Sequence, residues 1–147
     1  MGAEPYFYFV SYQPDITAAL QTLRQREFQA GRYNPVLPFL EFPLGPQSPS
    51  PGAQHSSIEA ACEEADADGT RSILDLDRVS KEPDFGAVTS LDESLLQQLY
   101  GTTRPTREMI ENNMDFFEEV ERGRRIYIIV YKDARPDEIF FAGYSYD

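Results

Sequence analysis

The sequence predicts an α+β domain: a mostly antiparallel sheet, formed by an N-terminal strand, middle strands and a C-terminal hairpin, with about four helices packed mainly on one face. Residues 6–13 are rich in aromatic side chains, with tyrosines and phenylalanines at alternating positions, which is typical of a strand. Two apolar runs at 125–131 and 138–146 are separated by a short connector with Asp and Pro, which indicates a hairpin. Between these ends, apolar residues recur at helical spacing.

The first helix is predicted to begin after Asp15, because Asp is a favoured N-cap. It is predicted to end at Gly31, because glycine accepts the left-handed backbone of a helix end. Its apolar stripe has spacings of four and three residues and consists of Ile16, Leu20 and Leu23.

A proline-rich irregular segment is predicted at about 33–54, because its prolines would interrupt a helix or a central strand. The first half of this segment is apolar and is expected to pack on the domain as an extended cover. The second half is polar and is expected to form a loop. The residues before the segment are too few to fold alone, so we treat 1–147 as a single domain.

Capping-box spacings mark two helices in the middle of the chain. Ser56 with Glu59 predicts the start of a short helix, and Ser90 with Glu93 predicts the start of another. The second of these helices is expected to stop at Gly101.

Three further segments complete the prediction. Residues 73–79 alternate as a strand would, but their apolar side chains would also line one stripe of a helix. Residues 85–90 are expected to be extended. Thr106 is expected to cap a last helix that runs to Gly123.

One stretch resembles the calcium-binding loop of the EF-hand over twelve residues. The side-chain oxygen ligands would come from Glu64, Asp66, Asp68 and Asp75, at loop positions 1, 3, 5 and 12. Gly69 fits the turn at position 6, but Arg71 brings a positive charge beside the site. We assign no metal here, because Asp and Gly are also favoured where a helix ends in a turn. A strand at 73–79 would exclude an EF-hand, which needs a helix there.

Tyrosines on one face of the predicted sheet are the candidate contacts for a partner. If the strands pair, Tyr6 shares this face with several of them. The residues proposed for binding are Tyr8, Tyr12, Tyr127, Tyr131 and Tyr144. Tyrosine offers a large contact area with a polar tip, which suits protein recognition. The alternatives are that these rings pack under the proline-rich cover, or that they reflect strand propensity alone.

The charge balance narrows the class of partner. The chain has 25 acids and 13 bases, a net charge of −12, which disfavours nucleic acids and anionic membrane surfaces. It favours a basic protein partner, with plain solubility as the alternative. The sequence shows neither a secretory signal nor an apolar run of about 18 residues, so a cytoplasmic location is expected.

Enzyme chemistry has little support in the sequence. Cys62 and His55 are the only residues of their types, they match no catalytic motif, and no cofactor motif occurs. Carboxylate chemistry stays open, because acids are abundant.

Two functions are therefore predicted first, and a calcium-dependent module is a third hypothesis. The first is a non-enzymatic protein-binding module, such as a toxin-neutralising immunity-type protein or a regulatory adaptor. The second is a small-molecule-binding protein or enzyme with a pocket between the sheet and the proline-rich segment. A homodimer through an edge strand, for which the C-terminal strand is the candidate, is a further hypothesis.

Overall fold

The structure, a computed structural model, describes residues 5–33, 48–65, 70, 72–84, 86–115 and 125–144. Its elements in chain order are β1 (Pro5–Ser11), α1 (Ile16–Ala30), α2 (Ile58–Glu64), the 3-10 turn η1 (Ile73–Asp75), β2 (Arg78–Val79), β3 (Ala87–Ser90), α3 (Glu93–Tyr100), α4 (Arg107–Asn112), β4 (Arg125–Lys132) and β5 (Arg135–Tyr144). The apolar half of the proline-rich segment lies outside the described residues.

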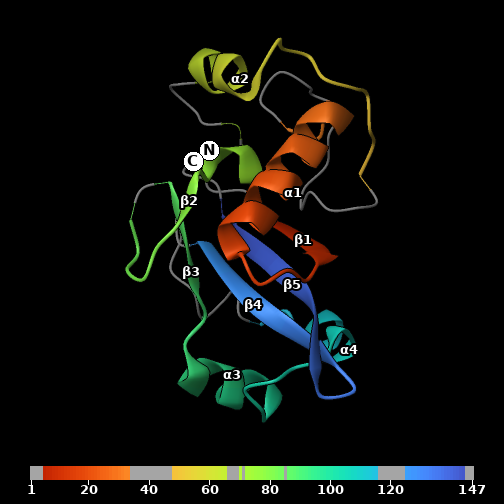
Figure 1. The fold of residues 1–147 in the computed structure, drawn as a ribbon, viewed down its shortest axis with the longest axis vertical. Coiled ribbons are helices and arrows are strands. Elements are labelled where there is room, and N and C mark those ends of the chain that lie inside the picture. Colours follow the sequence, from red (N-terminus) through yellow and green to blue (C-terminus); the bar gives the residue numbers. More distant parts are fainter. Residues whose placement is uncertain are drawn as a thin grey trace.

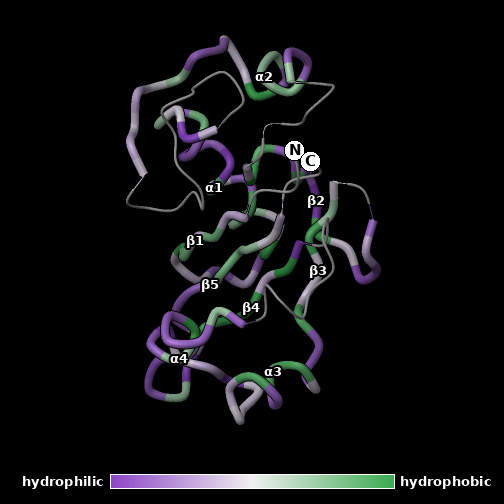
Figure 2. The backbone as a smooth tube through the Cα atoms, turned by 180° about the vertical axis from the view of Figure 1, so that it is seen from behind, coloured by the Kyte–Doolittle hydropathy of each residue, from purple (hydrophilic) through white to green (hydrophobic). Residues whose placement is uncertain are grey.

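The sheet has five strands in the order β1-β5-β4-β3-β2 (Figure 1). β5 pairs antiparallel with β1 and β4, whereas β3 pairs parallel with β2 and β4. The predicted α+β class with a mostly antiparallel sheet is confirmed. The central strands are mainly hydrophobic, and the connection between β2 and β3 is hydrophilic (Figure 2).

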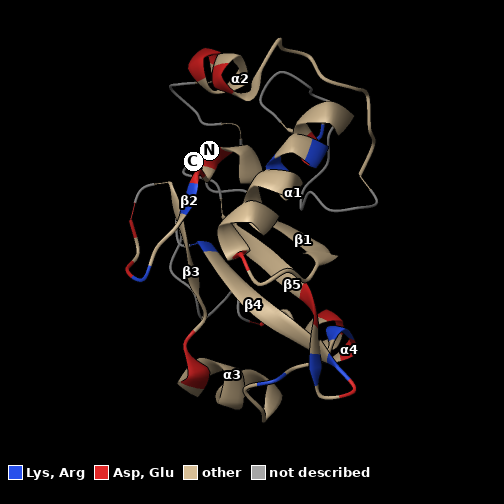
Figure 3. Cartoon of the chain, viewed as in Figure 1, with Lys and Arg blue, Asp and Glu red and all other residues tan. Residues whose placement is uncertain are grey.

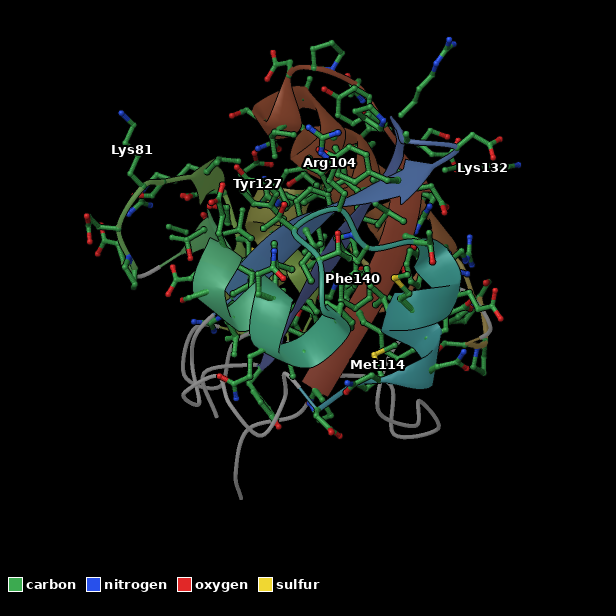
Figure 4. The ribbon with its side chains drawn as sticks, turned by 90° about the horizontal axis from the view of Figure 1, so that it is seen from below. Lys81, Arg104, Met114, Tyr127, Lys132 and Phe140 are labelled. Atoms are coloured by element: carbon green, nitrogen blue, oxygen red, sulfur yellow. The ribbon has the colours of Figure 1, made fainter. Side chains whose placement is uncertain are left out.

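The helices are divided between the two faces of the sheet, where the sequence indicated mainly one face (Figures 1 and 4). On the α1 side, Leu23 packs in one core with Tyr8, and on the α3–α4 side, Leu96 packs in another with Phe9. Tyr8 and Phe9 are neighbours in β1 and both are buried. A strand that is apolar on both sides needs cover on both faces, which explains the arrangement.

Most predicted helix ends are confirmed. The Asp15 side chain accepts a hydrogen bond from the Ala18 N–H (3.1 Å), and Gly31 ends α1 with a φ of 76°. Gly101 ends α3, and the Thr106 hydroxyl caps α4.

The N-caps of two helices differ from those that the capping-box spacings predicted. α2 is capped by Ser57 rather than Ser56, and α3 begins after Asp92 rather than Ser90. Ser90 is the last residue of β3 and is paired with Tyr127 of β4, so it cannot cap a helix. α4 ends at Asn112, well before the predicted stop at Gly123, which lies outside the described residues.

The segment 73–79 excludes the EF-hand. It forms the three-residue 3-10 helix η1 and then β2, and residues 72–84 contain no α-helix after the candidate loop. Asp75 has a structural role instead: its Oδ1 accepts hydrogen bonds from the N–H and the hydroxyl of Thr70, both at 2.7 Å. Asp66 and Asp68 lie outside the described residues. Within the described part of the chain, no three potential metal-binding side chains gather.

The β4–β5 hairpin turns on two residues, Asp133 and Ala134, with φ angles of 51° and 65°. This is tighter than the connector indicated by the sequence. Positive φ at both central residues characterises the type I′ turn, whose twist matches that of the strands.

Glycine at position 134 is expected to stabilise this hairpin. Alanine is disfavoured at a φ of 65°, whereas glycine is not, although glycine loses more backbone entropy on folding. We expect Ala134→Gly to raise stability by about 0.5–1 kcal/mol and Tm by about 1–4 °C in calorimetry. The β-branched variant Ala134→Val should lower Tm. If Ala134→Gly and Ala134→Val changed Tm equally, or if Ala134→Val were the more stable variant, the positive φ at position 134 would be contradicted.

The C-terminal strand is not an edge of the sheet. β5 lies between β1 and β4, so the expected pairing of this strand with a second copy is wrong. The edges are β1 and β2, because the N-terminal strand adds outside the hairpin.

Candidate functional site

The structure separates the five candidate tyrosines. Tyr8 is 0% exposed beneath α1, so its proposed role as a surface contact is wrong. Burial, and then the nearby Glu27 carboxylate, hold the pKa of Tyr8 well above its ordinary value. Tyr12 and Tyr144 are half-buried at opposite ends of the sheet, Tyr12 after β1 and Tyr144 at the end of β5.

Tyr127 and Tyr131 are the two candidates that lie together. Both are half-buried on β4, and both line one hollow of about 170 Å³. Figure 4 shows Tyr127 on the side of the sheet opposite to Phe140, which faces α3 and α4.

A gap beside β4 creates this hollow. β3 ends at Ser90, after which the Leu91 N–H donates to the Tyr127 carbonyl oxygen (3.1 Å). The chain returns to this edge at Pro105, whose carbonyl oxygen accepts from the Tyr131 N–H (2.8 Å). Leu91 and Leu96 also line the hollow, together with the polar residues Ser90, Glu93 and Thr103, so its wall combines aromatic, apolar and polar side chains.

A second, larger groove of about 600 Å³ lies on the other side of Tyr131, between α4 and the hairpin. Four carboxylates line this groove: Glu108, Asp133, Asp137 and Glu138. Glu138 accepts a hydrogen bond from Arg107 Nη1 (2.9 Å). The other three carboxylates form no ion pair within the described residues. With Lys132 as the remaining cation, the lining carries a net negative charge (Figure 3).

Two arginines support the aromatic residues of this surface. The Arg104 guanidinium lies over the Tyr131 ring, 5.7 Å from its centroid, and the Arg107 guanidinium lies 4.3 Å from the centroid of Phe9. Such cation–π contacts hold both partners in place. The sequence did not predict these two contacts, because the aromatic partners of Arg104 and Arg107 lie far away along the chain.

A separate polar cluster joins Tyr33, His55 and Glu64. The Gln54 N–H donates to the Tyr33 oxygen (2.9 Å), and the Tyr33 hydroxyl lies 2.8 Å from His55 Nδ1. His55 Nε2 lies 2.6 Å from a Glu64 oxygen, so Nε2 carries a proton and donates it to the carboxylate. Burial raises the pKa of Tyr33, which opposes its use as a base. The cluster therefore fastens residues 50–55 between α1 and α2.

Cys62 does not join His55. Its thiol donates to the Leu74 carbonyl oxygen (3.7 Å), and burial raises its pKa, which disfavours the reactive thiolate.

The chain matches no protein-family model, no curated protein and no solved structure. Among the described residues, no helix has the length and apolar content needed to cross a bilayer.

Removing the phenolic hydroxyl is expected to change the free energy of unfolding differently at two buried tyrosines. The Tyr8 hydroxyl makes no hydrogen bond within the described residues, so Tyr8→Phe should be neutral or slightly stabilising. Tyr33→Phe should cost about 1–2 kcal/mol, because Gln54 and His55 lose their partner. Urea unfolding measures both changes. A larger loss in Tyr8→Phe than in Tyr33→Phe would contradict these bonding patterns.

Proposed function

We propose that this protein is a non-enzymatic protein-binding module that binds a basic protein at the surface around Tyr131. The observation that carries the proposal is that Tyr131 lines both the hollow beside β4 and the larger groove with its four carboxylates. Tyrosine and arginine are enriched among the residues that dominate binding energy at protein interfaces. Here a half-buried tyrosine is already held by Arg104, so little side-chain entropy is lost when a partner binds.

The groove supports a basic rather than an acidic partner. Glu108, Asp133 and Asp137 form no ion pair within the described part of the chain, so they can accept hydrogen bonds from a lysine or arginine that enters beside Tyr131. The net charge of −12 would also attract a basic protein over longer distances and raise its association rate. An immunity-type protein or a regulatory adaptor would fit this description.

The alternative function as a small-molecule binder or enzyme has less support. Its expected pocket lies against the proline-rich segment, of which residues 34–47 are outside the described part of the chain. The hollow beside Tyr127, at about 170 Å³, is smaller than the usual ligand sites of roughly 300–1,000 Å³. The alternative and the cytoplasmic location stay predictions.

Affinity capture from the native host tests the proposal when three baits are compared. The wild-type chain should recover a basic protein, and Tyr131→Ala should recover at least about tenfold less of it. Met109→Ala is the matched control: this exposed apolar residue (42%) lines neither hollow, so recovery should be unchanged.

The recovered protein should then be purified and its association rate measured at increasing salt. The rate should fall steeply, because attraction between opposite charges is screened. The triple variant Glu108→Gln, Asp133→Asn and Asp137→Asn should lower the rate further. An acidic partner, a salt-independent rate, or equal recovery by Tyr131→Ala would refute the proposal.

A further inference from the structure

Within the described residues, one side of β1 has no strand partner. β1 is the outermost strand of the sheet, and no described element lies beyond it (Figures 1 and 2). The Tyr12 N–H donates to the Asp137 carbonyl oxygen (3.0 Å), in register with the β1–β5 ladder. Because backbone groups alternate along a strand, those of Phe7, Phe9 and Ser11 point away from β5. These outward groups form no hydrogen bond within the described residues.

The edge also lacks the usual protection against pairing. β1 is seven residues long and carries no charged side chain (Figure 3). Natural edge strands are commonly shortened, charged or interrupted by proline. The opposite edge follows that rule: β2 has two residues, and its Arg78 is held by Asp77 (3.0 Å) and Asp84 (2.6 Å). Within β1, Pro5 at the start of the strand is the one residue of a type that opposes pairing.

From these observations we infer that β1 pairs antiparallel with β1 of a second copy of this chain. A twofold axis through Phe9 places Phe9 opposite its own copy and Phe7 opposite Ser11. Each of the three residues then donates one hydrogen bond and accepts one, about six in all between the two chains. The two five-stranded sheets become one continuous sheet.

The charge distribution favours a second copy over a basic partner at this edge. A basic segment gains no ion pair from β1, because the strand is uncharged. β1 itself carries no carboxylate, so the twofold pairing brings no like charges together within the strand and is self-complementary without any charge. The inference does not rest on the proposed function, although Arg107, which lines the groove beside Tyr131, also lies over the Phe9 ring.

Sedimentation velocity on the full chain at roughly 1–300 µM tests the inference, since a small interface gives a weak dimer. The mass should rise with concentration from 16.8 kDa towards twice that value. Ser11→Pro removes an N–H that points outward, so the bonds to β5 stay intact. This variant should dissociate at least about tenfold more readily. Ser11→Ala, the control, keeps the N–H and should dimerise like the wild type.

Amide hydrogen exchange measured by NMR locates the contact. The amides of Phe7, Phe9 and Ser11 should gain protection as concentration rises, whereas those of Tyr8 and Val10 should be protected throughout. If circular dichroism shows that Ser11→Pro is unfolded, Ser11→Lys replaces it, because an edge lysine also opposes pairing. A chain that stays monomeric, a dimer unaffected by these variants, or protection that requires another protein would each overturn the inference.

Discussion

Gly31→Ala is expected to lower the free energy of unfolding by about 3 kcal/mol or more, as measured by urea denaturation. Two penalties combine at this helix end. Gly31 has a φ of 76°, which costs an alanine about 1–2 kcal/mol. An added Cβ would also lie 2.1 Å from the backbone oxygen of Gly52, and this oxygen cannot move aside as a side chain could. Gly52 is itself held there, because its N–H donates to the Ala30 carbonyl oxygen (2.8 Å).

Gly101→Ala is the matched control for this effect. Gly101 also ends a helix with a φ of 72°, but an added Cβ there would meet no atom within 4 Å. Its expected loss is therefore the conformational part alone, about 1–2 kcal/mol. Similar losses in the two variants would show that the close approach of Gly52 to α1 is not required for stability.

Arg32→Ala is expected to cost about 3–5 kcal/mol, because it leaves a buried carboxylate without its main partner. The Glu27 side chain is 0% exposed, and Arg32 holds both of its oxygens with bonds of 2.7 Å. Arg32 also donates to the Ser50 hydroxyl (2.6 Å), so its loss would release the polar half of the proline-rich segment.

Arg26→Ala separates the buried interaction from an exposed one at the same carboxylate. Arg26 donates to Glu27 Oε2 at 3.0 Å, but its side chain is 41% exposed and solvent screens the contact. Its removal should cost no more than about 1 kcal/mol. In the double variant Glu27→Gln with Arg32→Ala, the loss should be smaller than in Arg32→Ala, because no charge is left buried. Chemical denaturation at pH 7 of all three variants checks this ranking.

The sequence predicted which side chains share a face of the sheet. It did not predict which part of each face a helix covers. Alternation in β1 correctly separates Tyr8 from Phe9, and the same alternation in β4 places Tyr127 and Tyr131 together. Which part of a face a helix covers depends on where α1 crosses the sheet. α1 crosses over Tyr8 and leaves Tyr131 accessible, so one candidate contact is lost and another is retained.

The candidate site was predictable only in part, for a related reason. Tyr131 follows from strand patterning, whereas Arg104 and the groove carboxylates come from the α3–α4 connection, α4 and the hairpin. These pieces meet because β3 is short and the chain returns to β4 at Pro105. No local pattern encodes such a meeting.

By itself, the sequence determined the elements whose signals are local: the N-cap at Asp15, the stop at Gly31, and the two strands of the C-terminal hairpin. A cap or a positive φ involves only a few neighbouring residues, so it can be recognised in a short stretch. Tertiary structure decided that β1, rather than β5, forms an edge, and that helices cover both faces. Those outcomes depend on pairing between the two ends of the chain, which brings Tyr6 opposite Gly143, and such distant pairing has no local signature.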